Sequence, residues 1–240
     1  MNPKPTLIAE LIAEFLGTFV LILFGTGVVA MVVLFPSSNP GETIHGGFTN
    51  ITLGWGLAVT MGIYIAGKIS GAHLNPVVTL ADAMEGGISW TETPAYIFAQ
   101  VAGGISGAIV AHSMFGLPIV SLSRHARSGA AQMFSEFVAT FGLLAVIWGC
   151  SRLRSNATAF AVGAYITAAY WFTASTSFAN PAVTIARSLS DTFSGIRPAD
   201  APGFIVAQIA GAIAATLLFR WLIPALPSRA NDVVYPHGSK

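Results

Sequence analysis

The chain has 240 residues, of which 54% are hydrophobic and 9% are charged, and its formal net charge is +1. A soluble domain carries about 25% charged residues, so this composition excludes a protein whose whole surface faces water. The low charge and the lack of a basic tract also exclude nucleic acid as a partner. A single cysteine rules out an internal disulfide or a cysteine metal cluster.

Six apolar segments are long enough to cross a bilayer, which takes roughly 20 residues as a helix. In chain order the predicted spans are 7–34, 48–67, 94–114, 130–150, 158–176 and 203–223. The predicted fold class is therefore an all-α, multi-pass integral membrane protein. Residues 227–240 are predicted to form a polar C-terminal tail.

An Asn-Pro pair lies between the second and third spans, and another lies between the fifth and sixth. Asn75-Pro76 and Asn180-Pro181 each place a preferred helix N-cap before a residue that is tolerated at the first helical position. About ten helix-compatible residues follow each pair. At ~1.5 Å rise per residue they extend ~15 Å, half of a ~30 Å hydrocarbon core. The pairs therefore predict two half-helices that enter the membrane without crossing it.

The two halves of the chain repeat one another. Glu14 near the start of the first span is matched by Glu136 near the start of the fourth, and both halves carry the Asn-Pro pair. Each half has three spans, an odd number, so the second half is inverted relative to the first. Inverted repeats with broken helices build a solute site at the membrane midplane. One domain, residues 1–226, is predicted from repeats at about 1–115 and 128–226.

Inversion would bring the N-termini of the two half-helices together near the bilayer centre. Each N-terminus carries roughly half a positive charge and several unpaired N–H donors, so the pair repels cations. The amides of Asn75 and Asn180 would donate to a passing solute oxygen. Irregular backbone at membrane depth lines a wet cavity or is buried in protein. The predicted pore-lining residues before the two pairs are Gly71, Ala72, His73, Phe178 and Ala179.

The segments Ser70–Val77 and Phe178–Ala182 resemble the two signature loops of the aquaporin/glycerol-facilitator family, with Asn-Pro-Val in the first loop in place of the usual Asn-Pro-Ala. The resemblance covers essentially the whole chain. It implies six spanning helices with two re-entrant half-helices, a homotetramer with one pore in each subunit, and passive, bidirectional flow of small uncharged solutes. The expected location is the bacterial inner membrane with both termini in the cytoplasm, an orientation that the distribution of Lys and Arg also favours.

The resemblance also gives the positions of the outer selectivity filter. Counted from the two Asn residues, they are Trp55, Ala168, Ser177 and Val183. The family usually has Arg at the last position, so Val183 predicts a wide, largely apolar filter, and Val78 occupies the matching pore-lining position of the first half. Similar channels without this Arg occur in a bacterial branch associated with arsenic resistance. The predicted solutes are glycerol-like polyols, neutral metalloid hydroxides such as arsenite, and water.

Arg187 lies four residues after Val183, one helical turn along the same face. Helical side chains lean toward the N-terminus of their helix, so its guanidinium can reach back toward the filter and line the pore. The alternative is an arginine in the solvent or the lipid headgroups of the vestibule. The sequence leaves both interpretations open.

Glu14 and Glu136 are carboxylates inside the membrane, where ionisable residues are functional candidates. In a proton-coupled secondary transporter, the alternative function, they would relay protons. Their symmetric placement favours a bracing role, in which each accepts hydrogen bonds from the N–H groups of one re-entrant loop. The sequence contains few other intramembrane charges and no dedicated ion site, which favours the channel.

The remaining polar residues point to no reaction chemistry. No nucleophile–base pair, metal cluster or phosphate loop is apparent, so neither an enzyme nor a cofactor or metal is predicted. His112 and His125 lie near an expected outer loop with Arg124 and Arg127, and both histidines are predicted to be solvated rather than metal-binding. The predicted partners are small neutral solutes, the lipid bilayer and further copies of the chain.

Overall fold

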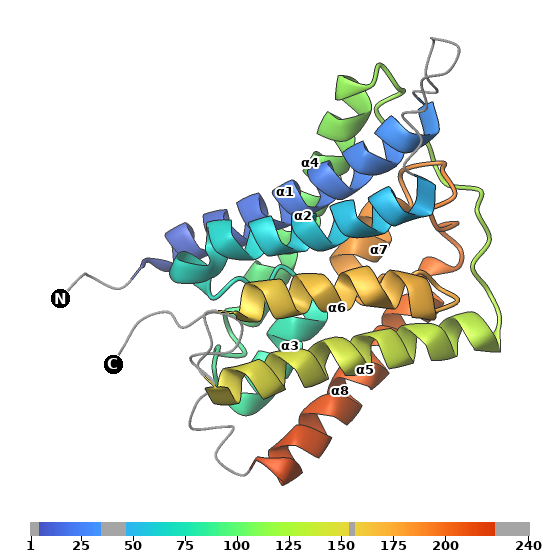
Figure 1. The fold of residues 1–240 in the computed structure, drawn as a ribbon. Helices are drawn as coiled ribbons and strands as arrows, with labels where there is room; N and C mark the ends of the chain where they lie inside the picture. The colour runs from blue at the N-terminus through green and yellow to red at the C-terminus, as the bar shows by residue number, and fades with distance from the viewer. Residues whose placement is uncertain (1–4, 35–46, 154–156, 224–240) are drawn as a thin grey trace.

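The structure is a computed structural model that describes residues 5–34, 47–153 and 157–223; the predicted tail, 227–240, lies outside them. Eight helices occupy these ranges (Figure 1). They are α1 (Leu7–Leu34), α2 (Gly47–Ser70), α3 (Pro76–Glu85), α4 (Thr93–Met114), α5 (Ala130–Leu153), α6 (Thr158–Phe172), α7 (Pro181–Arg187) and α8 (Ala201–Leu222). Of these, α1, α2, α4, α5 and α8 are long and apolar enough to cross a membrane.

The fifth predicted span, which corresponds to α6, is shorter than expected. It ends at Phe172 rather than at residue 176, because Thr173 has extended backbone (ψ 137°) and its hydroxyl donates to the carbonyl of Ala169 at 2.6 Å. The 15 residues of α6 extend ~22 Å at ~1.5 Å per residue. Beyond Thr173 the chain turns into the protein interior toward α7, and therefore does not complete the helix to the level that the sequence indicated.

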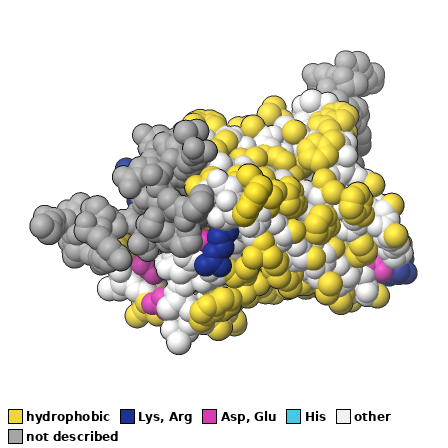
Figure 2. Space-filling view, turned by 90° about the horizontal axis from the view of Figure 1, so that it is seen from below, with side chains coloured by type: hydrophobic (Ala, Val, Ile, Leu, Met, Phe, Trp, Pro, Cys, Tyr) yellow, Lys and Arg dark blue, Asp and Glu magenta, His cyan; other side chains and the backbone are white. Residues whose placement is uncertain are grey.

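The outer surface of the bundle is apolar. Figure 2 shows one face on which hydrophobic side chains cover most of the middle. Large apolar side chains from different helices are strongly exposed, among them Ile8, Phe98, Phe134 and Val206. A continuous apolar surface of this kind is unfavourable in water and suits a lipid environment.

Glycines at matched positions allow close contact between neighbouring helices. A Cβ atom at Gly103 of α4 would overlap the carbonyl oxygen of Phe15 in α1, and one at Gly211 of α8 would overlap that of Phe137 in α5. Small residues let helix backbones approach closely, which is the main means of packing helices in lipid. The α1–α4 and α5–α8 pairs therefore pack in the same way in the two halves of the chain.

The two short helices α3 and α7 lie among the longer ones and do not traverse the bundle (Figure 1). Their N-caps have nearly identical backbone angles: φ −158°, ψ 119° at Asn75 and φ −159°, ψ 117° at Asn180. The helix α3 ends before Gly86, whose φ of +80° is unfavourable for other residues. The helix α7 has seven residues and is shorter than the ten predicted.

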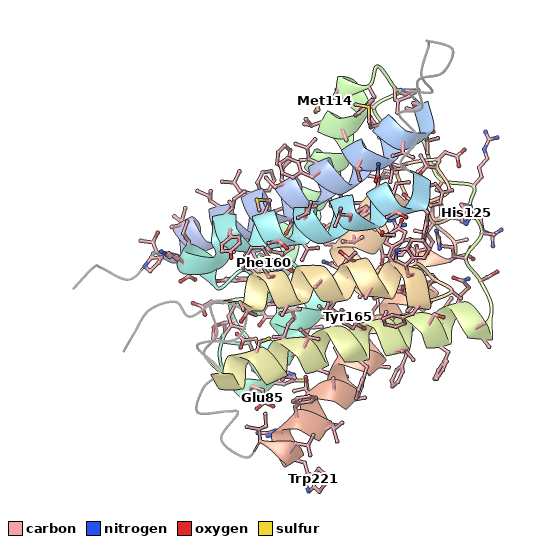
Figure 3. The ribbon with its side chains drawn as sticks, viewed as in Figure 1. Glu85, Met114, His125, Phe160, Tyr165 and Trp221 are labelled. Carbon is pink, nitrogen blue, oxygen red and sulfur yellow. The ribbon has the colours of Figure 1, made fainter. Side chains whose placement is uncertain are left out.

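The ends of the molecule can be told apart by labelled side chains. Glu85, at the end of α3, and Trp221, near the end of α8, lie toward the end at which α1 begins, and His125 lies at the opposite end (Figure 3). The chain near His125 is tied to the segment after α7, because the N–H of Ser123 donates to the carbonyl of Ser188 at 2.9 Å. The two half-helices therefore extend toward opposite ends of the bundle.

Candidate functional site

The N-termini of α3 and α7 meet through a reciprocal pair of hydrogen bonds. Asn75 Nδ2 donates to the carbonyl of Ala179 at 2.8 Å, and Asn180 Nδ2 donates to the carbonyl of Leu74 at 2.9 Å. Each Asn Oδ1 accepts from the N–H of the second residue of its own helix, at 3.1 and 2.9 Å. An amide nitrogen carries two protons, so each Asn retains one donor for a solute.

The backbone before each Asn adopts the left-handed region at matched positions. Ala72 and Leu74 have φ of 53° and 50°, and Ser177 and Ala179 have φ of 46° and 50°. Non-glycine residues adopt this region only at an energetic cost of about 1–2 kcal/mol each. The local sequence therefore does not favour these loops, and contacts with the rest of the protein must hold them.

Glu14 and Glu136 supply those contacts. Glu14 accepts hydrogen bonds from the N–H groups of the two residues before Asn75, at 2.8 and 2.7 Å, and Glu136 does the same before Asn180, at 2.8 and 2.9 Å. Both side chains are fully buried. Such charge-assisted bonds are roughly twice as strong as neutral ones. The geometry favours the bracing interpretation, because both oxygens of each carboxylate are occupied by backbone donors.

A second layer of polar residues supports each glutamate. Gln100 donates to Glu14 at 2.6 Å and to the hydroxyl of Thr79 at 2.8 Å. In the other half, Gln208 donates to Glu136 at 2.7 Å and to the hydroxyl of Thr184 at 2.9 Å. The same network is therefore built twice, once around each half-helix.

A narrow cavity lies between the two half-helices and the inner faces of α1, α2, α5 and α6. Most of its wall is apolar and includes Leu21, Val59, Leu143 and Ile166. Of the predicted site residues, the following line it: Trp55, Ala72, His73, Asn75, Val78, Ser177, Phe178, Ala179, Asn180, Val183 and Arg187. Pro76 and Pro181 are buried at the first positions of α3 and α7.

Two of the predicted residues, Ala168 and Gly71, are not among those that line the cavity. Ala168 is exposed on the outside of α6, and Tyr170 lines the cavity instead. Residues two apart on an α-helix point in nearly opposite directions, so a residue count that ignores where α6 ends selects the wrong face. Gly71 is buried but does not line the cavity: its φ of 84° turns the chain out of α2, and its N–H donates to Gly67 at 3.1 Å.

Arg187 reaches into the cavity. Its side chain is buried, with the residue 3% exposed, and its Cζ lies 3.5 Å from the centre of the Phe178 ring and 5.3 Å from that of Trp55. Its Nε donates to the carbonyl of Ser194. Of the two interpretations that the sequence left open, the structure has the arginine at the pore rather than in the lipid headgroups.

Comparison with known proteins identifies the family. The family model described as major intrinsic protein matches residues 2–156 and 150–238. The chain belongs to the major intrinsic protein family. Members of this family are membrane channels and not enzymes, so this chain is a multi-pass membrane channel.

Individual relatives of this major intrinsic protein are similar over most of its length. Aquaglyceroporin AqpS of Rhizobium meliloti (strain 1021) is 46% identical over 219 residues, covering 90% of this chain and 91% of the relative. The glycerol uptake facilitator protein of Streptococcus pneumoniae (strain ATCC BAA-255 / R6) is 37% identical over 171 residues, covering 65% and 71%. The X-ray structure of the aquaglyceroporin from Plasmodium falciparum matches with a TM-score of 0.69 at 26% identity, covering 92% of this chain and 99% of that one.

The prediction that His112 of this major intrinsic protein is solvated is wrong: the residue lies in α4 and is buried, with its Nε2 2.7 Å from the hydroxyl of Ser190. Arg127, in the loop after α4, is buried as well. It is 4% exposed, and its guanidinium donates to the carbonyls of Ser175, Phe193 and Gly195 at 2.8, 2.8 and 2.6 Å. Burial, together with the neighbouring Arg187, lowers the pKa of Arg127 to about 10. Nothing in its local sequence marks it as buried, because its partners are backbone groups more than forty residues along the chain.

The opposite end of the cavity holds a buried histidine–aspartate pair. His73 Nε2 lies 3.3 Å from Asp82 Oδ2, and both side chains are buried. The His73 Nδ1 lies 3.2 Å from the hydroxyl of Thr79, and the ring lies 5.4 Å from that of Tyr96. The channel therefore has an arginine at one end of the cavity and a histidine–aspartate pair at the other.

Proposed function

We propose that this channel conducts small uncharged solutes passively and in both directions, namely glycerol-like polyols, neutral metalloid hydroxides such as arsenite, and water. The observation that carries the proposal is the pair of Asn75 and Asn180 amides, fixed at facing helix N-termini beside a cavity with a mostly apolar wall. The printed names of two relatives, an aquaglyceroporin and a glycerol uptake facilitator, support the same solute class.

A polyol fits this cavity because it has an apolar side, formed by its C–H groups, and a polar side, formed by its hydroxyls. Its C–H groups contact the apolar wall, formed in part by Val59 and Leu143, while its hydroxyls meet the Asn amides along the opposite side. An ion would lose its hydration shell against the same apolar wall without replacement ligands, and an uncompensated charge is very costly in such a site. The two helix N-termini add a positive potential that further disfavours cations.

Val183 supports the inclusion of solutes larger than water. It is a short apolar side chain that lines the cavity where the family usually has an arginine. Arsenous acid is neutral and presents three hydroxyls around a compact centre, so it offers the same hydrogen-bonding groups as glycerol. The metalloid is therefore proposed on the same physical grounds as the polyol.

A proton-coupled transporter is the second candidate, and the site disfavours it. Proton coupling needs a carboxylate that is free to exchange its proton, whereas Glu14 and Glu136 are each engaged by two backbone N–H groups and a glutamine. Protonation of either glutamate would replace accepting oxygens with a donor and leave buried backbone N–H groups unpaired.

The arrangement of the protein in the membrane is also a proposal. The start of α1 and the end of α8 lie at the same end of the bundle (Figure 1), where Lys68 and Arg220 are exposed. By the positive-inside rule this end faces the cytoplasm of a bacterial plasma membrane. By resemblance to the family, four copies associate with one pore in each, and light scattering in detergent tests this.

The test is stopped-flow permeability of purified protein in liposomes to water, glycerol and arsenite. We expect each solute to enter faster than in empty liposomes, at a rate that rises linearly with concentration and does not change when a proton gradient is imposed. Equal rates with and without protein would overturn the channel. Flux that saturates or follows the proton gradient would favour the transporter.

A further inference from the structure

We propose that Arg187 is the cation that sets the solute size limit and excludes cations at the outer constriction, in place of an arginine at position 183. The inference deepens the proposed function and rests on it for the class of solute. It assigns a selectivity role to a residue one helical turn from the expected filter position. Five lines of geometry carry it: the rings around the guanidinium, its anchors, its unpaired donors, its reach, and the matched pair in the other half.

Three aromatic rings from different segments surround the guanidinium. Cζ lies 3.5 Å from the ring centre of Phe178, 5.3 Å from that of Trp55 in α2 and 5.8 Å from that of Tyr170 in α6. Aromatic faces attract a cation, and arginine stacks on them more favourably than lysine does. The rings therefore hold the arginine within the lining of the cavity at a defined position.

Polar contacts orient the guanidinium without neutralising it. Nε donates to the carbonyl of Ser194, and Nη2 lies 3.4 Å from the hydroxyls of both Tyr170 and Thr176. Within the described residues no carboxylate lies within ion-pair distance of the guanidinium. Glu136 acts on it only from beyond that distance, and its neighbour Arg127 has the same sign. The positive charge of Arg187 is therefore available to act on whatever enters the cavity.

Unsatisfied polar groups lie beside this charge. Nη1 of Arg187 has no hydrogen-bond partner among the residues that the structure describes, nor do the buried Trp55 Nε1 and Ser177 Oγ. All three residues line the cavity. Buried polar atoms are normally paired, so these groups indicate a place for a solute with several hydroxyls.

The position of Arg187 follows from helix geometry. Val183 and Arg187 lie one turn apart on the same face of α7, and a long side chain leans toward the N-terminus of its helix. Val183 is small and apolar, and both Val183 and Arg187 line the cavity. An arginine at both positions would place two cations at one constriction. With valine at 183 and arginine at 187, the constriction carries a single cation from this helix.

The other half of the chain shows that this reach is built into the fold. Arg187 lies seven residues after Asn180 and contacts Phe178, two residues before it. Asp82 lies seven residues after Asn75 and contacts His73, again two residues before it, at 3.3 Å. In both half-helices, the residue two before the Asn thus contacts the residue seven after it, beside the cavity. In the second half, this pair is Phe178 and Arg187, and it presents a positive charge.

The experiment compares Arg187→Leu with Arg124→Leu in liposomes. Arg124 is a matched control at the same end, because its side chain is 92% exposed and lies 3.9 Å from Asp191. We expect Arg187→Leu to raise the ratio of erythritol to glycerol permeability about tenfold, equivalent to ~1.4 kcal/mol, and to admit methylammonium. Arg124→Leu should match the unsubstituted channel. An unchanged ratio together with continued exclusion of methylammonium in Arg187→Leu would overturn the proposal.

Two further variants keep the test decisive if Arg187→Leu does not fold, which size-exclusion chromatography would show. Arg187→Lys retains the charge but lacks the planar fork, so it should still exclude methylammonium while the solute ratio rises. The double variant Val183→Arg/Arg187→Leu should restore exclusion of both erythritol and methylammonium. Admission of methylammonium by Arg187→Lys, or by the double variant, would count against the proposal.

The readouts separate this inference from the proposed function. If the unsubstituted channel does not conduct glycerol, the proposed solute class fails, but entry of methylammonium relative to water still reports on Arg187. If glycerol passes and the variants change neither the ratio nor cation entry, the solute class stands and the role of Arg187 fails.

Discussion

Asn75 and Asn180 each perform two tasks with one short side chain. The Oδ1 atom caps the helix that begins at the next residue, and the Nδ2 atom donates to the opposite loop. Both tasks require an amide, since a carboxylate could cap the helix but would have no proton to donate. The residue type is therefore fixed by local and long-range geometry together.

Replacing the Asn75 amide tests this requirement. Asn75→Asp should abolish glycerol flux and lower the free energy of unfolding by about 1–3 kcal/mol, because the carbonyl of Ala179 loses its donor and faces a buried carboxylate. Thermal unfolding in detergent and liposome flux would measure both effects. Asn50→Asp, at an exposed position of α2, is the matched control and should change neither. An active, fully stable Asn75→Asp channel would contradict the assignment.

Glu14 gives a second prediction at the level of a single residue. Glu14→Gln should reduce flux to a similar extent at every pH between about 6 and 8, because a glutamine NH2 group repels the N–H donors that the carboxylate accepts. Liposome flux across this range is the measurement. If the unsubstituted channel showed a pH dependence that Glu14→Gln removed, Glu14 would be a proton relay and not a brace.

At the level of whole elements, the sequence predicts where α3 and α7 begin better than where they end. Both starts depend on adjacent residues, an N-cap and a proline, so they can be recognised locally. The end of α7 at Arg187 has no such local mark, and that residue contacts rings of Trp55 and Phe178. The end of α6 is likewise not marked locally, because it lies where the chain turns into the protein interior. Tyr170, rather than Ala168, therefore lines the cavity.

Helix packing also gives a prediction. Gly103→Ala should lower the free energy of unfolding by about 1–3 kcal/mol, the usual cost of overpacking, because the added methyl group would overlap the backbone of α1. Gly149→Ala is the matched control: no atom lies within 4 Å of its added Cβ, and alanine favours a helix over glycine by about 1 kcal/mol. Thermal unfolding should separate the two, and equal stability would contradict the packing role of Gly103.

Across the whole molecule, the burial of loop residues is the feature that the sequence could not predict. The pattern of apolar segments was sufficient for the bundle, because each spanning helix must bury its own backbone polar groups. Arg127 looks like any exposed loop arginine in sequence, yet the folded chain surrounds it with three carbonyls. Only the arrangement of several loops at the end of the bundle near His125 makes such a site.

The stability of this same end of the bundle should respond to acid. Asp200 accepts a hydrogen bond from Arg197 at 2.9 Å and another from the N–H of Arg127 at 2.9 Å. The Arg197 hydrogen bond keeps the pKa of Asp200 below its ordinary value of 3.8. The pair therefore stabilises the folded protein fully above pH 3.8, and this contribution is lost as the pH falls through the lowered pKa.

Asp200→Asn should accordingly weaken the dependence of the melting temperature on pH below about 4, where carboxylates in folded proteins take up protons. Melting curves of both proteins in detergent between about pH 3 and 7 would test it. The substitution should lower the melting temperature most near neutral pH, where the ion pair is intact. Parallel curves at every pH would show that Asp200 contributes nothing to the acid response.

The reciprocal bonds between the two loops have a consequence for how the protein is made. The carbonyl of Leu74 receives its proton from Asn180, and that of Ala179 receives its proton from Asn75. While only the first half has left the ribosome, the Asn75 amide and the Leu74 carbonyl both lack their partners. The first re-entrant loop can therefore reach its final form only after the second has been synthesised and inserted, so the conducting path is completed late and a truncated chain contains no finished pore.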